Sequence, residues 1–260
     1  MSASTSNALI GATGFVGGNL PAKSFSERYH SKNIQEIRGR RFDLVVCAGA
    51  PAAKWKANQD PDGDLANLRV LMDCLGAVEC NRFVLISTVD VFGTPLGVDE
   101  SSMVNPAEAT AYGRHRYFLE EFVRERFRTS NCIRLPGLYG SGLKKNIIFD
   151  LLHRNTLHLT HADSEFQFYH LARLFRDMET ALARDLPLVH LAVEAVKVRD
   201  MVRHCFGEEF DNVTPAGPVR YDLRTRFGEL FGGTGAYIQS AADSLDEIRA
   251  YVQSEQAARL

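Results

Sequence analysis

A glycine-rich turn close to the start of the chain places the strongest constraint on its fold. A short apolar run at residues 7–10 leads directly into GATGFVGG, which spaces Gly11, Gly14 and Gly17 three residues apart. Between a strand and a helix, this spacing permits a tight turn, close approach of the backbone to a pyrophosphate, and close packing of the helix on the sheet. The N-terminus of the helix offers N–H groups and partial positive charge to phosphates. We therefore expect a dinucleotide here; the alternative is a tight turn that binds nothing.

Patterns typical of strands and helices alternate after this turn. An extended piece is expected at 25–29, a short helix opened by Asn33 in a capping box with Glu36, strands at 42–47, 82–87 and 132–135, and helices at 64–78 and within 106–127. Uninterrupted apolar runs are typical of parallel strands that are covered on both faces. The alternation implies right-handed crossovers, so the predicted fold class is α/β, a doubly wound, Rossmann-like parallel sheet.

The pattern loosens beyond Pro136. Helices are expected at 146–153, 171–183, 221–230 and 242–256, and strands at 166–169 and 188–192. We predict a dinucleotide-binding domain over residues 1–142. Residues 143–260 are expected to form a small C-terminal substrate lobe, interleaved with elements that return to the sheet.

Charge and composition exclude several classes of protein. With 30 basic and 32 acidic residues the net charge is −2, which leaves no positive excess for nucleic acid. No run approaches the ~20 apolar residues of a membrane span, and the first residues do not form a secretory signal. The five cysteines are odd in number and lie mostly in apolar runs, as in a cytoplasmic protein with reduced thiols. The histidines lack a cysteine or carboxylate that would complete a ligand set, so no metal is expected.

Four motifs in order carry a resemblance to a known family. They are GATGFVG, AGAP at 48–51, STVDVFG at 87–93 and YGRHR at 112–116. Together they resemble the extended short-chain dehydrogenases/reductases, which include nucleotide-sugar epimerases, dehydratases and 4-keto reductases. The resemblance covers residues 7–139 well, and LPGLYGSG at 135–142 extends it.

The resemblance implies three catalytic residues. The family's Ser/Thr, five residues before the glycine of its VYG-like tripeptide, corresponds to Thr88, and its Tyr-x-x-x-Lys motif falls on Tyr112 and Arg116, with arginine in place of lysine. Hydride transfer at a secondary alcohol or ketone needs a coupled proton, which a tyrosine supplies when its pKa is lowered from about 10. A cation one helical turn away favours the phenolate, and Thr88 would hydrogen-bond the reacting oxygen. A guanidinium keeps the charge of an ammonium but places its donors differently.

The cofactor is expected to be NADP or NAD, with a preference for NADP. Residues 29–33, at the end of the second strand, lack the carboxylate that usually binds the ribose 2′-OH of NAD, whereas Ser31 and Lys32 would tolerate a 2′-phosphate. The alternative is that these two form an exposed turn only. The expected cofactor-binding residues are Gly11, Thr13, Gly14, Phe15, Val16, Gly17, Ser31, Lys32, Ala48, Gly49, Ala50, Arg116 and Pro136.

The leading hypothesis is a cytoplasmic NAD(P)-dependent oxidoreductase or epimerase acting on a hydroxyl or ketone of a nucleotide-sugar-like small molecule. We favour 4-keto reduction over epimerisation, because the chain is short for this family. Dehydration ranks last, since Val89 replaces the first residue of the acidic pair that the family's dehydratases carry. Because Arg116 replaces lysine, a catalytically weak dinucleotide sensor or assembly protein is the alternative, and a cofactor-free scaffold is a third. The helices at 64–78 and 111–127 match the family's dimer contact, which predicts a homodimer, or they simply cover the core.

Overall fold

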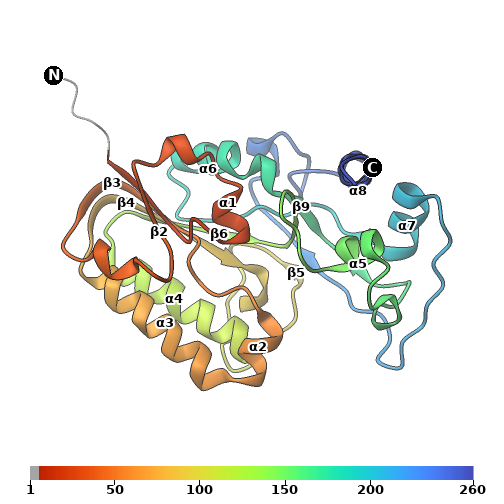
Figure 1. Ribbon diagram of the computed structural model, residues 1–260, viewed down its shortest axis with the longest axis horizontal. Helices are drawn as coiled ribbons and strands as arrows, with labels where there is room; N and C mark the ends of the chain where they lie inside the picture. The colour runs from red at the N-terminus through yellow and green to blue at the C-terminus, as the bar shows by residue number, and fades with distance from the viewer. Residues whose placement is uncertain (1–5, 260) are drawn as a thin grey trace. The chain divides into compact units, whose positions relative to one another are not determined.

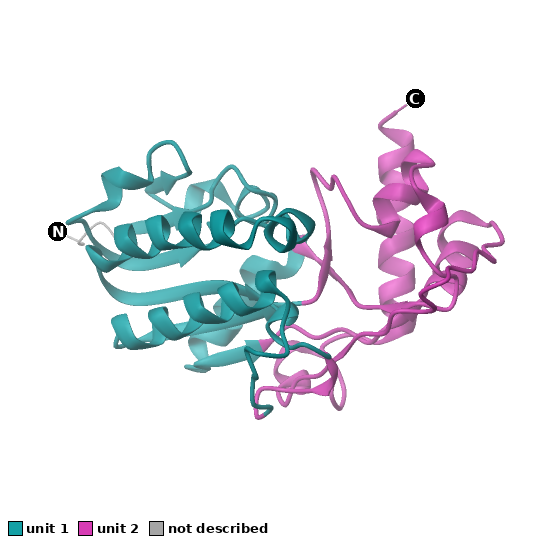
Figure 2. Cartoon of the chain, turned by 90° about the horizontal axis from the view of Figure 1, so that it is seen from below, with its two compact units in different colours: residues 1–94, 102–135, 172–189 teal, residues 95–101, 136–171, 190–260 magenta. Residues whose placement is uncertain are grey.

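The computed structural model describes residues 6–259, which divide into two compact units (Figure 2). Unit 1 contains the chain up to Thr94 together with residues 102–135 and 172–189. Unit 2 contains residues 95–101, 136–171 and the chain from His190 onwards. The second half of the chain therefore contributes to both units. None of the helices within 6–259 is long and apolar enough to cross a membrane.

A six-stranded sheet forms the centre of unit 1, in the order β10-β6-β4-β3-β1-β2. Neighbouring strands from β2 through to β6 pair in parallel, which confirms the predicted doubly wound α/β fold. The strand order reverses between β1 and β3, and ligands of such sheets bind at the carboxyl ends of the strands at this point. The bounds are β1 Asn7–Ile10, β2 Glu27–Tyr29, β3 Arg41–Cys47, β4 Glu79–Thr88, β6 Ser130–Leu135 and β10 Leu188–His190.

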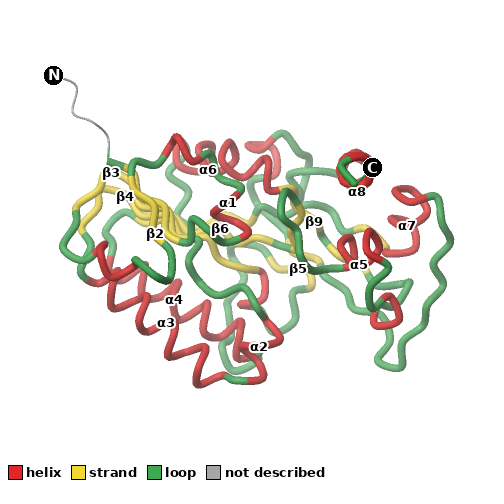
Figure 3. Tube along the Cα trace, viewed as in Figure 1, coloured by secondary structure: helices red, strands yellow, loops and turns green. Residues whose placement is uncertain are grey.

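Helices cover both faces of this sheet (Figures 1 and 3). Helices α3, Pro61–Gly76, and α4, Ala111–Arg126, lie side by side on one face, and α6, Leu174–Ala183, lies on the other. Helix α3 begins with Pro61 at its first position, and the Asp60 carboxylate accepts a hydrogen bond from the Gly63 N–H. The core between α3, α4 and the strands includes Leu68, Leu75, Leu119, Val45 and Phe83.

The helix after the glycine turn is a single turn long. Helix α1 spans only Phe15–Gly18, and Asn19 caps its C-terminus. Two glycines at its end and Pro21 shortly after it oppose continuation, because glycine has a high conformational entropy and proline lacks an N–H. A one-turn helix aligns few peptide dipoles, so the individual N–H groups provide most of the attraction for an anion.

Two local predictions are wrong. Asn33 does not form a capping box with Glu36: its side chain accepts a hydrogen bond from the His30 N–H (2.7 Å), and a 3₁₀ turn follows at Ile34–Ile37. The helix predicted at 221–230 is instead a short strand, β12, Asp222–Leu223, followed by a loop and the 3₁₀ turn Gly228–Phe231.

Unit 2 is built from three strand pairs and three α-helices. Strand β12 pairs with β5, Leu96–Val98; β7, Gly137–Tyr139, pairs with β9, Phe168–His170; and β8, Glu165–Phe166, pairs with β11, Val196–Lys197. The strand predicted at 166–169 is thus divided between two pairs at Gln167. The helices are α5 Ile147–His153, α7 Val198–Phe206, which the sequence did not predict, and α8 Ala241–Ala257. A second core includes Ile148, Met201 and Ile248 from these helices.

Candidate functional site

The glycine turn is held by close backbone contacts. Gly11 has φ of +83°, and a Cβ there would lie 2.3 Å from the Ala48 carbonyl oxygen. A Cβ on Gly17 would lie 2.2 Å from the Gly11 carbonyl oxygen, so packing alone requires both glycines. Gly14 differs, because its nearest such neighbour is the Gly11 oxygen at 3.2 Å. Among the described residues no side chain caps α1 at Gly14, so no side chain accepts a hydrogen bond from the N–H groups of its first turn.

The end of β2 is hydrogen-bonded to this glycine turn. The Tyr29 carbonyl accepts hydrogen bonds from the N–H groups of Gly11 (2.8 Å) and Ala12 (3.1 Å). The exposed residues Ser31 and Lys32 follow directly, so they lie at the same edge of the sheet as the glycine turn. The structure thus brings together the parts that would bind the phosphates and the adenosine ribose.

The segment after β3 completes this edge. The Ala48 N–H donates to the Ile10 carbonyl (2.9 Å), and a Cβ on Gly49 would meet the Ile10 side chain at 2.8 Å. The loop at 48–50 therefore packs on the glycine turn, where Thr13 is exposed and Phe15 and Val16 are half-buried. Pro136 follows β6 as the first residue of a segment of unit 2.

Thr88 and Tyr112 come from neighbouring elements of unit 1. Thr88 ends β4, and its hydroxyl accepts a hydrogen bond from the Asp90 N–H (3.2 Å) in the 3₁₀ turn Val89–Val91. A Cβ on Gly113 would lie 1.8 Å from the Asp90 carbonyl oxygen. Because glycine at 113 permits this contact, the first turn of α4, which carries Tyr112, packs directly on the turn that follows Thr88.

The start of α4 is also held by a helix that the sequence did not predict. Helix α2 spans Lys54–Gln59, and its Asn58 Oδ1 accepts a hydrogen bond from the Tyr112 N–H (3.0 Å). At the other end of α2, Lys54 Nζ forms an ion pair with Asp90 Oδ1 at 2.6 Å. This short polar segment has no apolar periodicity that would have revealed it.

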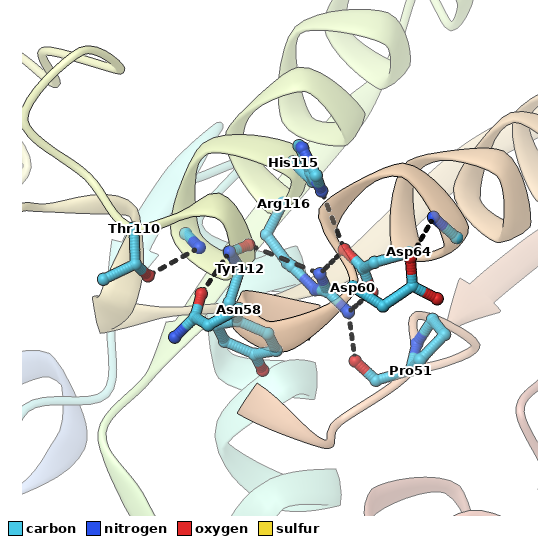
Figure 4. A network of polar contacts seen from close by, with 10 residues as sticks. Pro51, Asn58, Asp60, Asp64, Thr110, Tyr112, His115 and Arg116 are labelled. Carbon is cyan, nitrogen blue, oxygen red and sulfur yellow. Dashed lines mark hydrogen bonds and ion pairs between the residues drawn. The ribbon is translucent and has the colours of Figure 1, made fainter. Parts of the chain in front are cut away.

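Arg116 lies in a buried ion pair (Figure 4). Its guanidinium binds both carboxylate oxygens of Asp64, with Nη2 at 2.9 Å from Oδ1, and Nη2 also donates to the Pro51 carbonyl. His115 Nδ1 lies 2.8 Å from Asp64 Oδ2. Burial raises the pKa of the Asp64 carboxyl, but hydrogen bonds to Arg116 and His115 outweigh it and hold this pKa below its ordinary value. Sequence analysis missed Asp64, because its partners lie on another helix.

The guanidinium of Arg116 also lies over the ring of Tyr112, with Cζ at 4.0 Å from the ring centroid. Burial raises the pKa of the Tyr112 phenol, and the opposing effect of the guanidinium does not overcome it. The direction is opposite to the lowering that we expected from a cation at position 116. In this structure the phenol therefore holds its proton at neutral pH.

Comparison with known families gives one match. The description of the matching family is "NAD dependent epimerase/dehydratase family", and the match covers residues 28–162, slightly more than half of the chain. It contains the loop after β3, the turn after Thr88 and the start of α4. No curated protein sequence matches this chain.

Solved structures share the fold over nearly the whole chain. A UDP-glucose 4-epimerase from Thermotoga maritima, solved with UDP-glucose, has a TM-score of 0.73 at 13% identity, covering 98% of this chain and 100% of that one. A dTDP-4-dehydrorhamnose reductase from Bacillus anthracis, in complex with NADP, has a TM-score of 0.72 at 18% identity, covering 98% and 100%. A dTDP-glucose 4,6-dehydratase from Streptomyces venezuelae, with NAD and TYD bound, has a TM-score of 0.70 at 16% identity, covering 96% and 97%. At these identities the likeness establishes the fold.

Proposed function

Since the chain belongs to the NAD dependent epimerase/dehydratase family, we propose that it is an NAD(P)-dependent oxidoreductase that acts on a hydroxyl or ketone of a nucleotide-sugar-like substrate. Reduction of a 4-keto group is the favoured reaction. The observation that carries this proposal is the contact between the first turn of α4 and the Asp90 carbonyl, which brings the segment of Tyr112 against the turn after Thr88.

The edge of the sheet at the strand reversal suits a dinucleotide. The backbone around Gly14 would take the pyrophosphate, and Ser31 and Lys32 would face the adenosine ribose or its phosphate. The loop at 48–50 packs against the glycine turn and would lie beside the same dinucleotide. When bound, the nicotinamide supplies or accepts a hydride. Every other part of the chemistry falls to the protein's own side chains.

Tyr112 would give a proton to the substrate oxygen, and the Thr88 hydroxyl would hydrogen-bond the same oxygen while its negative charge develops. Reduction of a ketone needs a donor that carries its proton at neutral pH. Burial raises the pKa of Tyr112, so the phenol is in this form. Oxidation of an alcohol needs the phenolate instead. This protonated form suits the reductive direction, but the raised pKa makes the phenol a weaker acid than the lowered pKa expected from the sequence, so the preference for reduction rests on the length of the chain.

The segment after Thr88 argues against dehydration. Val89 is 3% exposed and apolar, so it supplies no acid. The Asp90 carboxylate is engaged with Lys54 Nζ at 2.6 Å. Val89 lacks the carboxyl group that the family's dehydratases carry at this position, so the expected acid for elimination of water is missing.

The second candidate is a dinucleotide-binding sensor or assembly protein with little turnover. The observation that favours it is the position of Arg116, whose guanidinium donates hydrogen bonds to the Asp64 carboxylate and the Pro51 carbonyl. A cation held in this way is not available to a bound ribose. In this second candidate the protein keeps the fold and the glycine turn, but its rate of turnover is low.

Binding and turnover, measured separately, test both candidates. Trp55 is the only tryptophan of the chain and is 67% exposed on α2, so energy transfer from it to reduced nicotinamide reports binding. NADPH at 100 times its dissociation constant is expected to stabilise the fold by ~2.7 kcal/mol in thermal unfolding. The enzyme proposal expects NADPH oxidation with at least one member of a panel of nucleotide-linked keto sugars. Binding without turnover across the panel supports the sensor, and no binding of either dinucleotide contradicts both.

We expect Lys32→Ala to weaken NADPH binding roughly fivefold and leave NADH binding unchanged, because an exposed ion pair contributes up to about 1 kcal/mol. Lys23→Ala is the matched control: this lysine is also exposed, and it lies before β2. Titration of each variant with both dinucleotides, followed by Trp55 fluorescence, measures the ratio. An equal loss for NADH and NADPH would remove Lys32 from the 2′-phosphate site.

A cytoplasmic location and a homodimer are further parts of the proposal. The dimer contact would use α3 and α4, which expose Val70 (51%) and Phe118 (37%). Exposed apolar side chains on neighbouring helices are typical of such contacts. Sedimentation velocity that shows only a monomer at micromolar concentration would contradict the dimer.

A further inference from the structure

The guanidinium of Arg116 contacts three elements of unit 1 (Figure 4). From α3, the Asp64 carboxylate accepts hydrogen bonds from both Nη atoms, with Nη2 at 2.9 Å from Oδ1. From the loop after β3, the Pro51 carbonyl accepts a further hydrogen bond from Nη2. On α4 itself, the guanidinium lies over the Tyr112 ring, with Cζ at 4.0 Å from the ring centroid. Two other elements therefore set the position of the group that contacts this ring.

Asp64 sets the orientation of the guanidinium. A carboxylate and a guanidinium that meet through two parallel hydrogen bonds share one plane, which gives the pair a defined geometry. The side chains of Asp64 and Arg116 are 5% and 4% exposed, so water competes little for these bonds. His115 Nδ1 lies 2.8 Å from Asp64 Oδ2, which limits rotation of the carboxylate. With its plane held in this way, the guanidinium supports one face of the Tyr112 ring.

The remaining donor of Arg116 lies close to the same ring. Within residues 6–259 its Nε is buried and has no hydrogen-bond partner. Nε is bonded to Cζ, which lies 4.0 Å from the ring centroid. A guanidinium over an aromatic face is attracted by the ring, most strongly where both are removed from water. A lysine at 116 would have no planar group that could pair with Asp64 through two bonds and also cover the ring.

We propose that Asp64 is a positioning residue for proton transfer at Tyr112: it holds the Arg116 guanidinium against the ring, so that the phenol has one orientation before the substrate binds. Arg116 then supports the tyrosine ring instead of binding the nicotinamide ribose. Misplacement of a reacting group by about 1 Å can lower a rate by roughly a hundredfold, so support of this kind affects turnover. The effect on turnover rests on the proposed function, whereas the contact with the ring does not.

The contact with the ring is tested without substrate. In ¹⁵N-labelled protein, the Arg116 Nε–H resonance is identified by its loss in Arg116→Lys. An aromatic ring shields a proton that lies over its face, so Tyr112→Leu should shift this resonance downfield. We expect Asp64→Asn to shift it in the same direction, because the amide presents N–H donors to the guanidinium in place of one acceptor oxygen. Asp62→Asn, which changes an exposed carboxylate in the first turn of the same helix, is the matched control and should leave the resonance unchanged.

Turnover distinguishes positioning from a general loss of structure. We expect Asp64→Asn to lower kcat for a keto sugar at least tenfold, while KM changes less than about threefold. In Tyr112→Phe there is no phenol to position, so the addition of Asp64→Asn should lower the residual rate by less than about twofold. The double variant Asp64→Leu/Arg116→Leu removes both buried charges, and its kcat should stay low even where its stability recovers.

Three results would overturn the inference: an unchanged Nε–H resonance in Asp64→Asn, an equal loss of rate when Asp64→Asn is added to Tyr112→Phe, or turnover that recovers together with stability in the double variant. Each would mean that the ion pair serves the fold alone. If the resonance shifts but the wild type turns over no keto sugar, the support of the ring is confirmed and the proposed function fails. Normal turnover without a shift of the resonance would remove the inference and leave the proposed function intact.

Discussion

Replacement of Arg116 by leucine is expected to lower the free energy of unfolding by about 3–5 kcal/mol, the usual loss when one partner of a buried ion pair is removed. The Asp64 carboxylate is 5% exposed and would keep His115 as its side-chain partner in α4. The Pro51 carbonyl would also lose the donor that it has in Arg116. A buried acceptor without its partner is costly, because water cannot replace the lost bond. Urea unfolding measures the loss.

Two variants separate this effect from a general sensitivity of α4. Arg124 is on the same helix and half-exposed, with Nη2 at 3.4 Å from Glu120, so Arg124→Ala should cost no more than about 1 kcal/mol. The double variant Arg116→Leu/Asp64→Leu removes both charges, and we expect it to recover part of the loss. Arg116→Lys keeps the charge but loses the bidentate geometry and should fall between the wild type and Arg116→Leu. If Arg116→Leu were no more harmful than Arg124→Ala, the buried pair would not stabilise the fold.

The central sheet could be predicted because its information is local. Short apolar runs lie within β3 (LVVC) and β4 (FVLI), β6 contains the apolar pair CI before Arg134, and the amphipathic stretches between these strands become α3 and α4. Hydrophobic periodicity this strong predicts the type of secondary structure correctly, even where tertiary contacts also act on the segment. The glycine turn indicates where α1 begins, but it contains no information about where this helix ends.

The region around Leu223 shows where local patterns fail. Residues 221–230 have apolar side chains at helical spacing, yet buried Gln167 donates to the Leu223 carbonyl (2.7 Å) and accepts from its N–H (2.7 Å). The Glu100 carboxylate accepts from the Thr225 hydroxyl and the Arg226 N–H. These distant side chains take the backbone groups that a helix would have used, so an extended conformation results. No window of the sequence around Leu223 contains this information.

The candidate site also contains residues that local motifs predict and residues that only the tertiary structure reveals. Thr88 and Tyr112 follow from motifs that lie on single segments. Asp64, Asn58 and Lys54 act on α4 or on the turn that packs against it, from positions far away in the sequence. Their side chains are of types that are common on exposed helices, so the sequence alone gives no reason to pair them. The substitution of arginine for lysine at 116 is visible in the sequence, but its consequence depends on Asp64.

Removal of one hydroxyl is expected to have the largest effect on activity. In Tyr112→Phe the ring remains under the Arg116 guanidinium, so the fold and dinucleotide binding should persist. The proton donor is lost, and general acid–base catalysis contributes roughly 10²–10⁴ in rate, so we expect kcat/KM for a keto sugar to fall by about this factor. Initial rates of NADPH oxidation measure the loss, and Trp55 fluorescence measures binding in the same samples.

Tyr117→Phe provides the matched control for this prediction. Tyr117 is on the same helix, and its ring lies beside Arg124, with Cζ at 5.7 Å from the ring centroid, away from the contacts that hold Tyr112. Loss of its hydroxyl should leave kcat/KM within about twofold of the wild type, because no proton passes through it. A loss of less than about tenfold in Tyr112→Phe, with dinucleotide still bound, would mean that solvent or another group delivers the proton. The contact between α4 and the turn after Thr88 would then serve the fold alone, and the case for a reductase that uses this phenol would fail.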